Sequence, residues 1–490
     1  MTRLSPATLS RLRPGVQLPG YERATLKYGI VHLGLGAFVR GHLADYTDDA
    51  LALSFGDWGI IGVSLKRPDQ RDRLSPQDGL FTTMSLSGGT ARPRIIGCLK
   101  QVLVAPQDRE AVISAMSDGM CRIVSLTVTE KGYCHDPATG LLDRNHPDIL
   151  HDLENPGAPS SAVGLIVAAL ARRHAAGLPP FTVLCCDNLP DNGSLLAGLV
   201  RDFAGLRDAA LSGWIAANGA FPSTMVDRIV PAMTDADIQA AAAATGLFDA
   251  APVSHEPFRQ WVIEDHFVGG LRPAWDLVGA QMVTAVAPYE HMKLRLLNGA
   301  HSALAYLGAL AGHEVISDVV ADPIFARYLR LLWAEEILPV TPPPSGVDLG
   351  AYAAQLHARF ANAAIRHRTM QIAMDGSQKL PQRLLSTIRE RLARGLPIDR
   401  LALAVAAWIR FVGGIDEAGE IIDVRDPLAA HLCEVSARAG ADPAAKARAI
   451  IGVAAVFGAD LPQSEPFVAA VTRAVRSLYA LGARRAAAAL

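Results

Sequence analysis

Short apolar runs alternate with helical patterns over the first 200 residues of this 490-residue chain, and this alternation limits the folds open to it. Runs rich in β-branched residues have the character of buried strands at residues 29–36, 58–65, 121–130 and 181–188. Helical segments, such as residues 162–177, lie between them. Because parallel strands need helical crossovers, the pattern predicts an α/β domain whose parallel sheet is covered by helices on both faces.

Helical periodicity dominates from about residue 285 onward, where the strand signals fade. The whole chain is also longer than one ordinary domain, since single cores rarely serve more than about 300 residues. We therefore predict two domains: an α/β domain with extensions at residues 1–280, and a mainly α-helical domain at residues 281–490.

The composition excludes several classes of protein. The 46 basic and 48 acidic residues give a formal net charge of −2, so we expect no nucleic-acid partner, which would need a basic surface. Hydrophobic residues make up 50% of the chain and charged residues 19%, which is typical of a globular protein with large cores.

The cysteines indicate neither disulfides nor a zinc site. They are Cys98, Cys121, Cys134, Cys185, Cys186 and Cys433. No two of them form a CxxC pair, so we expect reduced thiols and no bound metal. The N-terminal stretch MTRLSPATLSRLRPG lacks the apolar core of a secretory leader, and no run of about 18 apolar residues follows. We expect a cytoplasmic protein with no membrane partner.

The first predicted strand runs into a glycine turn in GIVHLGLGAFVRGH. Gly34 and Gly36 would let the backbone turn tightly and approach a pyrophosphate at the start of the next helix. Gly41 comes late, however, so the spacing is GxGxxxxG rather than GxGxxG. The motif alone leaves a cofactor site and a plain turn equally open.

The second predicted strand bears on the choice of cofactor. Asp69 is the carboxylate nearest to its end, where an acidic residue commonly holds the adenosine ribose hydroxyls of NAD. Lys66 and Arg67 stand beside it and would suit the 2′-phosphate of NADP, or all three are solvated loop charges. We favour NAD and keep NADP as the alternative.

Three polar residues, Lys293, Asn298 and His301, interrupt the apolar stretch HMKLRLLNGAHS at residues 291–302. On an α-helix with about 100° per residue, all three fall within a sector of about 140°. A core Asn or His would be ordinary, but Lys is almost never buried unless paired. A buried lysine with a lowered pKa can act as general acid and base in hydride transfer. Glu290, three residues earlier, would either tune this lysine or be a surface carboxylate.

A second polar group follows a predicted strand in CCDNLPDNG. Asp187 and Asn188 stand where parallel sheets deliver ligands, at the carboxyl end of a strand. Asn188 alone would be an ordinary helix cap. Together with Asn298 it would instead make a pair of amide donors for an oxyanion.

Motifs throughout the chain resemble the long-chain polyol dehydrogenase family. They are VHLGLGAF, SLTVTEKGYC, CCDNLPDNG, MVDRIVP, EPFRQWVIED, MKLRLLNGAHSALAYLG and MDGSQKLPQRLL. The resemblance implies an N-terminal Rossmann-type domain, a helical substrate domain and zinc-independent hydride transfer with NAD. It also implies that Gly34, Gly36, Ala37, Phe38 and Asp69 contact the cofactor.

The resemblance also implies a catalytic set. Lys293 matches the family's catalytic lysine, and Asn188 and Asn298 match its oxyanion-holding asparagines. His301 matches the histidine that orients the substrate. Glu290 matches a carboxylate behind the lysine.

The substrate within the family follows from other positions. Mannitol dehydrogenases tend to carry an arginine at the position of Gln371 and a small residue at that of Arg295, so this chain looks more like the fructuronate reductase branch. That resemblance implies reversible reduction of D-fructuronate to D-mannonate with NADH.

Substrate contacts come from further positions. Asp227 and Lys379 match substrate-site residues of the family. A uronate carboxylate needs a cationic partner, for which Lys379 and Arg368 are our candidates, with Arg259 less favoured.

Other functions stay open. They are mannitol 2-dehydrogenase or another polyol, ketose or tagaturonate-type oxidoreductase, a nucleotide-dependent binding protein without turnover, and a metal-dependent alcohol dehydrogenase. The predicted partner is a small sugar acid or polyol. A monomer is compatible with the sequence.

Overall fold

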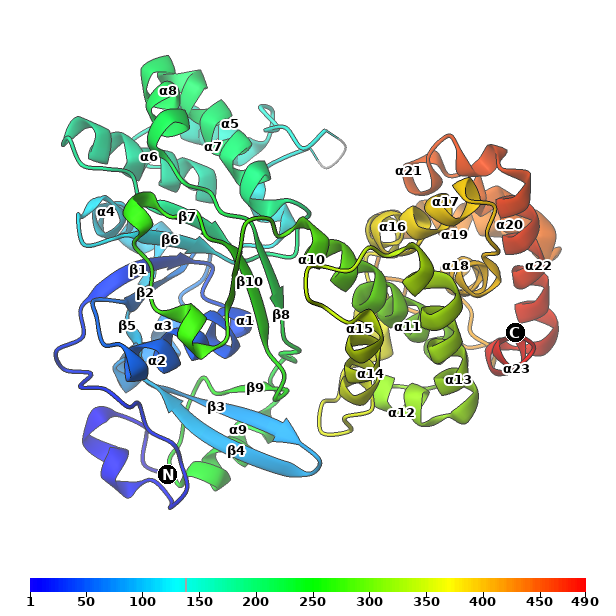
Figure 1. Cartoon of the computed structure of the whole chain (residues 1–490), viewed down its shortest axis with the longest axis horizontal. Helices are drawn as coiled ribbons and strands as arrows, with labels where there is room; N and C mark the ends of the chain where they lie inside the picture. Colours follow the sequence, from blue (N-terminus) through cyan, green and yellow to red (C-terminus); the bar gives the residue numbers. More distant parts are fainter. Residues whose placement is uncertain (137–138) are drawn as a thin grey trace. The chain divides into compact units, whose positions relative to one another are not determined.

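Figure 1 shows a computed structural model of the chain, which describes residues 1–136 and 139–490. The chain forms two compact units, Met1–Ala287 and Pro288–Leu490. The sequence pattern had placed the domain boundary earlier, between residues 280 and 281. The difference arises because strand β11 (Gln281–Val283) pairs with a strand of the first unit.

A five-stranded sheet forms the centre of the first unit. Its strands are β1 (Tyr28–Leu33), β2 (Gly59–Ser64), β5 (Leu99–Val104), β6 (Ile123–Leu126) and β7 (Thr182–Cys185). They lie in the order β5-β2-β1-β6-β7, and every neighbouring pair is parallel, which confirms the predicted Rossmann-type domain. The chain order reverses between β1 and β6. Ligands of such sheets bind beyond the carboxyl ends of the strands at this switch point.

Both faces of the central sheet pack against helices (Figure 1). In β1, Val31 and Leu33 join a core with several helices, whereas Ile30 joins a separate core on the other face. This split follows from the two-residue repeat of a strand and explains why the strand sequences are almost wholly apolar. The helices are α2 (Leu43–Leu53) on one face and α4 (Ala105–Ser117), α6 (Ala162–Ala175) and α7 (Asn192–Arg207) on the other.

Two small sheets in the first unit were not predicted from the sequence. One has the order β11-β10-β8 and the other β4-β3-β9. Their strands are short, and β9 and β3 are far apart in the sequence, so local periodicity gave little sign of them. Their strands are β3 (Phe81–Ser87), β4 (Thr90–Ile96), β8 (Thr224–Asp227), β9 (Val253–His255) and β10 (Gln260–Glu264). The remaining helices are α1 (Ala37–Gly41), α3 (Asp69–Leu74), α5 (Pro147–Glu154), α8 (Ala209–Asn218) and α9 (Asp235–Thr245).

The second unit is built from helices, as predicted. At its centre α11 (Ala300–Leu310) and α18 (Asp399–Phe411) are almost wholly buried, and α18 packs against α22 (Glu465–Leu481). Three segments are π-helical: η6 (Leu294–Gly299), η7 (Leu332–Ile337) and η9 (Pro381–Leu385). The other helices are α12 (Ile316–Ala321), α13 (Pro323–Leu331), α14 (Leu349–Phe360), α15 (Thr369–Ala373), α16 (Gly376–Leu380), α17 (Ser386–Ala393), α19 (Ala429–Arg438), α20 (Pro443–Ile451), α21 (Ala454–Phe457) and α23 (Ala483–Ala488). Helix α10 (Ala287–Lys293) begins at the last residue of the first unit.

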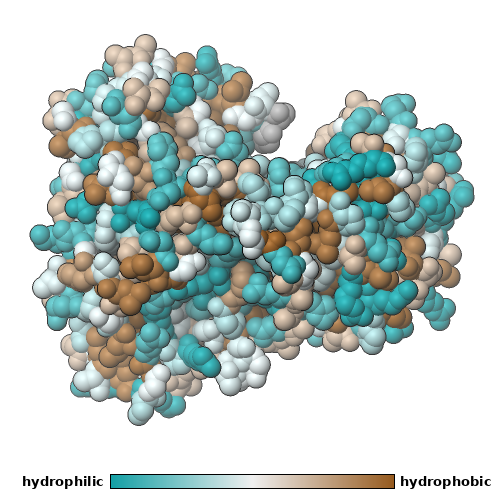
Figure 2. Space-filling model, viewed as in Figure 1, coloured by the Kyte–Doolittle hydropathy of each residue, from teal (hydrophilic) through white to brown (hydrophobic). Residues whose placement is uncertain are grey.

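Hydrophilic and hydrophobic residues are interspersed over the face seen in Figure 2. Among the helices of the described residues, none combines the length and the apolar character needed to cross a membrane.

Candidate active site

The glycine turn lies at the carboxyl end of β1, beside the switch point. Gly34 has φ 95°, and a Cβ there would lie 2.1 Å from the carbonyl oxygen of Thr127, so only glycine fits. A Cβ on Gly36 would meet nothing nearer than 3.9 Å, so the space in front of this residue is open. Ala37 and Phe38 begin α1, and the first N–H groups of a helix have no partner within it. The turn therefore offers backbone donors to an approaching phosphate.

A buried histidine anchors this turn. The Thr127 hydroxyl donates to the Gly34 carbonyl oxygen at 2.8 Å, so it accepts from Nε2–H of His32 at 2.9 Å. Nδ1 of His32 is then free to accept from the Ser125 hydroxyl at 2.8 Å. Burial lowers the pKa of His32 to about 3, which keeps the ring neutral for this chain of hydrogen bonds.

Polar groups for a cofactor also lie beyond β2. Asp69 is exposed at the first position of α3, past the end of the strand. The Ser64 hydroxyl and Oε1 of Gln70 are buried and have no hydrogen-bond partner in the described part of the chain. Buried polar atoms are rarely left without partners, so this region fits a polar ligand. Neither Ser64 nor Gln70 stood out in the sequence.

The end of β7 carries the predicted polar pair. Asn188 is exposed, and it does not cap the next helix, because the cap of α7 is Asp191. The capping interpretation of Asn188 is therefore wrong. Asp187 accepts hydrogen bonds from Val128 N at 2.7 Å and from the Tyr133 hydroxyl at 2.7 Å. Elsewhere in this unit, Asp227 is buried as the last residue of β8.

In the second unit a π-helical turn aligns the three polar residues of HMKLRLLNGAHS. Lys293 ends α10, Asn298 lies in η6 and His301 lies in the first turn of α11. The stretch was assumed to be one continuous α-helix, which would set Lys293 and Asn298 about 140° apart. That assumption was wrong, because residues 294–299 form a π-helix. A π-helix bonds residues i and i+5, so it places these two on the same side. Asn298 and His301, three residues apart, also share a face.

These three side chains are buried, with exposed fractions of 8% for Lys293, 7% for Asn298 and 6% for His301. Nδ2 of Asn298 and Nε2 of His301 are buried and have no hydrogen-bond partner within residues 1–136 and 139–490. Two such atoms so close in the sequence fit a polar ligand. Glu290 lies one turn before Lys293 in α10 and is partly buried.

Basic groups surround His301. Its ring stacks on Phe360 at 4.9 Å and meets the ring of His367 edge-on at 4.6 Å. Burial lowers the pKa of His301 well below its usual value, and the charged groups that lower this pKa further are all basic. These groups are His367, Arg383, Arg359 and Lys379. His301 is therefore neutral, in a region that favours negative charge.

Arg383, which the sequence analysis did not single out, is the least compensated of these groups. Its Nη1 donates to the Ser302 hydroxyl at 3.1 Å, and no carboxylate of the described residues lies within ion-pair distance. Burial lowers the pKa of this guanidinium. Arg383 is partly buried and its guanidinium has no carboxylate partner among the described residues, so it fits an anionic ligand.

The other predicted cations lie in different settings. Nζ of Lys379 donates to the Met374 carbonyl oxygen and lies 3.9 Å from a carboxylate oxygen of Asp375. Arg368 is exposed at the start of α15. Arg259 is committed to ion pairs with Asp45 and Asp49, each at 2.7 Å, which agrees with its low rank as a substrate residue.

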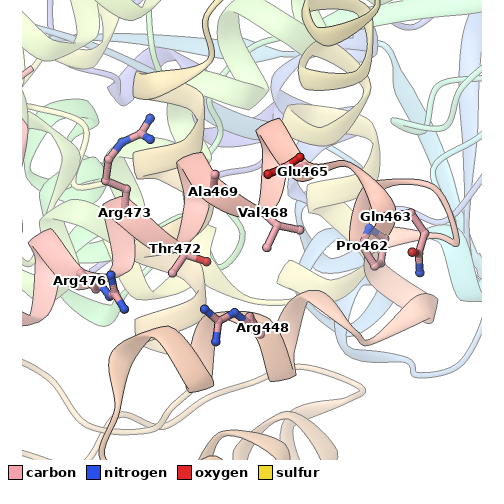
Figure 3. A pocket seen from close by; sticks show the side chains of 9 residues that line it. All are labelled: Arg448, Pro462, Gln463, Glu465, Val468, Ala469, Thr472, Arg473 and Arg476. Carbon is pink, nitrogen blue, oxygen red and sulfur yellow. The ribbon is translucent and has the colours of Figure 1, made fainter.

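Two further features lie outside the predicted residues. A surface groove of about 590 Å³ in the second unit runs along α22 and carries Arg448 and Arg476 (Figure 3), but none of the predicted site residues lines it.

In the first unit the ligand atoms of Cys134, His146 and Asp148 lie within 4.8 Å of one another. Nδ1 of His146 accepts from Asp148 N to cap α5, and burial raises the pKa of the Cys134 thiol to about 12.

The sheet, the glycine turn at its switch point and the buried lysine with its amide and imidazole neighbours define a two-unit dehydrogenase. Family models bear this out. The mannitol dehydrogenase Rossmann domain matches residues 28–277, and the mannitol dehydrogenase C-terminal domain matches residues 285–479. The chain belongs to the mannitol dehydrogenase family of oxidoreductases, which confirms the resemblance.

Named relatives include enzymes for acidic and for neutral substrates. D-mannonate oxidoreductase of Escherichia coli (strain K12) is 48% identical, over 97% of this chain and 98% of its own. Mannitol 2-dehydrogenase of Pyricularia oryzae is 41% identical, over 94% and 93%. The structure of Pseudomonas fluorescens mannitol 2-dehydrogenase in a ternary complex with NAD and D-mannitol matches with a TM-score of 0.90 and 40% identity, over 99% of each chain.

Proposed function

We propose that this enzyme reversibly reduces D-fructuronate to D-mannonate with NADH. The observation that supports the choice of an acidic substrate is the group of basic side chains around His301, above all the partly buried Arg383, which has no carboxylate partner among the described residues. A neutral polyol would leave this charge uncompensated, whereas a uronate carboxylate would neutralise it. The 48% identity to D-mannonate oxidoreductase supports the same substrate.

The proposed cofactor site is the switch-point edge of the central sheet. Backbone groups of Gly34, Gly36, Ala37 and Phe38 would hold the pyrophosphate, and Asp69 the adenosine ribose. NADH, when bound, supplies the hydride. The NAD complex of Pseudomonas fluorescens mannitol 2-dehydrogenase supports this choice of cofactor, and NADPH is the alternative.

The chain's own groups would manage the charge on the substrate oxygen. As hydride reaches the carbonyl carbon, Lys293 gives its proton to the carbonyl oxygen, which becomes the new hydroxyl. Asn188 and Asn298 donate hydrogen bonds to this oxygen while it carries negative charge. Neutral His301 orients a substrate hydroxyl, and Glu290 returns a proton to the lysine. No step requires a metal ion.

The remaining contacts select the substrate. We place the carboxylate against Arg383, with Lys379 as a second cation, and Asp227 against a hydroxyl group. Arg368 is a weaker candidate, because its exposed guanidinium is solvated by water. We further propose that the enzyme works in the cytoplasm as a monomer, without nucleic acid or membrane partners.

The test is a comparison of kcat/KM for D-fructuronate and D-fructose, each with NADH and with NADPH. We expect D-fructuronate with NADH to be preferred at least about tenfold, the value of one charge-assisted hydrogen bond. A clear preference for D-fructose would identify a mannitol 2-dehydrogenase instead. That second candidate rests on the TM-score of 0.90 and on the 41% identity to the Pyricularia oryzae enzyme.

A further inference from the structure

Thr129 has a backbone conformation that residues with side chains rarely adopt. Its φ is 65° and its ψ is 161°, a region that is almost confined to glycine, and a β-branched side chain makes it less favourable still. Such strain persists only where the surroundings impose it, and it concentrates at functional sites. Because the Thr129 side chain is exposed, its own packing does not supply the force.

The carboxylate of Asp187 imposes the conformation of Thr129 through hydrogen bonds. Oδ2 accepts from Val128 N at 2.7 Å, and Oδ1 accepts from Thr129 N at 3.3 Å. Two consecutive N–H groups thus converge on one carboxylate, which an extended chain does not allow because its N–H groups alternate in direction. Oδ2 also accepts from the buried Tyr133 hydroxyl at 2.7 Å. Asp187 therefore holds both the strained residue and the turn that follows it.

The segment at residues 127–129 lies at the switch point of the sheet. It directly follows β6, whose neighbours in the sheet are β1 and β7. Thr127 is tied to the end of β1 through the Gly34 carbonyl oxygen, whereas Val128 and Thr129 are tied to Asp187 past the end of β7. The segment thus connects the carboxyl ends of three adjacent strands.

This position relates the segment to one half of a dinucleotide. The glycine turn after β1 and Asp69 after β2 belong to the adenosine half. Such domains consist of two similar halves, each of which binds one mononucleotide. The nicotinamide half of the cofactor would therefore lie beyond β6 and β7. Residues 127–129 and Asn188 stand at the ends of these two strands.

We propose that Asp187 is a positioning residue, which holds residues 127–129 in a strained turn so that the turn fixes the nicotinamide end of NADH beside Asn188. This inference rests on the proposed use of NADH. The strain is the free energy spent on holding the turn in one conformation before the cofactor arrives. Asp187 itself acts only through the backbone that it binds.

A purely structural role would predict different behaviour. If Asp187 served only the fold, its replacement would lower the unfolding midpoint through the loss of its three hydrogen bonds, and Thr129→Gly would not restore kcat. Positioning predicts instead that function depends on this carboxylate more than stability does.

The experiment is a double-mutant cycle with Asp187→Ala and Thr129→Gly. Glycine adopts φ near 65° without steric cost, so it allows the turn to form without the carboxylate. We expect Asp187→Ala to lower kcat about 100-fold, the loss typical of a misplacement of about 1 Å. We expect the double variant to recover at least about tenfold of this loss. Thr129→Ala is the matched control, because alanine removes the side chain but keeps the strain, and it should give no recovery.

Two measurements without turnover accompany the cycle. Without cofactor, Thr129→Gly should raise the thermal unfolding midpoint by roughly 2 °C, since the strain is relieved. NADH affinity, measured by fluorescence titration, should change less than about threefold in Asp187→Ala, because the substitution does not touch the proposed pyrophosphate and ribose contacts after β1 and β2. Where Asp187→Ala does not fold, Asp187→Asn replaces it in the cycle, since the amide keeps one acceptor oxygen.

The inference is overturned if the Asp187 variant keeps kcat within twofold of the wild type. It is also overturned if Thr129→Gly restores none of the lost kcat, or fails to raise the unfolding midpoint. All rates are measured with both D-fructuronate and D-fructose. A preference for D-fructose would refute the proposed substrate and leave this inference intact, because both reactions need the same hydride transfer.

Discussion

Replacing the partly buried Arg383 by methionine tests the proposed substrate at one side chain. Methionine keeps an unbranched apolar stem but removes the guanidinium. In the free enzyme that guanidinium has one side-chain hydrogen bond, to Ser302, and burial lowers its pKa. Its removal therefore costs the fold little: about 1 kcal/mol for the hydrogen bond, offset in part by the relief of a partly buried charge. We expect the free energy of unfolding to change by less than about 1 kcal/mol.

The catalytic effect should be larger and selective. A hydrogen bond between a guanidinium and a carboxylate contributes about 1.5–3 kcal/mol, which corresponds to a loss of roughly 10- to 150-fold in kcat/KM for D-fructuronate. D-fructose has no carboxylate, so its kcat/KM should fall less than about threefold. The ratio of the two values should therefore fall by at least about threefold.

The assay is the initial rate of NADH oxidation, followed at 340 nm, across concentrations of each substrate. Arg366→Met is the control, since Arg366 is exposed and its guanidinium lies 3.7 Å from the equally exposed Glu314. Arg368→Met, tested in parallel, addresses the neighbouring candidate. Equal losses for both substrates in Arg383→Met would show that Arg383 supports the site in general, and selectivity lost only in Arg368→Met would move the carboxylate to Arg368.

Four further outcomes follow from the structure. Lys293→Ala should lower kcat by about 10²- to 10⁴-fold and leave NADH affinity nearly unchanged; near-normal kcat would remove the lysine from the acid–base role. Gly34→Ala should abolish NADH binding or folding, because its Cβ would lie 2.1 Å from the Thr127 carbonyl oxygen, and a variant with normal affinity and melting temperature would contradict this. Treatment with EDTA followed by gel filtration should leave kcat unchanged, whereas a loss that Zn²⁺ restores would establish a metal requirement. His32 stays neutral in the fold with a pKa of about 3, so its contribution to stability is complete above pH 6.5 and declines as the pH falls toward 3; at pH 5 the loss should be about 2 kcal/mol, and urea unfolding of His32→Asn should show a correspondingly flatter pH dependence.

The sequence predicted the architecture because local patterns carried it. Runs such as residues 29–36 and 58–65 are apolar throughout, which is the mark of strands buried on both faces. The three-residue strands β9 and β11 escaped prediction, since each is stabilised by a partner strand and not by its own pattern.

The candidate site was also predicted only in part from the sequence. Lys293, Asn298 and His301 stood out because polar residues in an apolar stretch are costly, and that cost is visible in the sequence. Their alignment was derived for an α-helix, whereas the structure forms a π-helical turn. The two types of helix differ in their backbone hydrogen bonds, which the sequence does not reveal.

By itself, then, the sequence determined the order of most strands and helices, the glycine turn and the types of candidate catalytic side chain, all of which are recorded within short stretches of chain. Only the tertiary structure decided that Arg383 is partly buried without a carboxylate partner among the described residues, and that Asp187 holds Thr129 in a strained turn. Burial and strain are properties of groups brought together from distant parts of the chain. Asp187 and Thr129 are 58 residues apart, and neither pattern nor composition joins them.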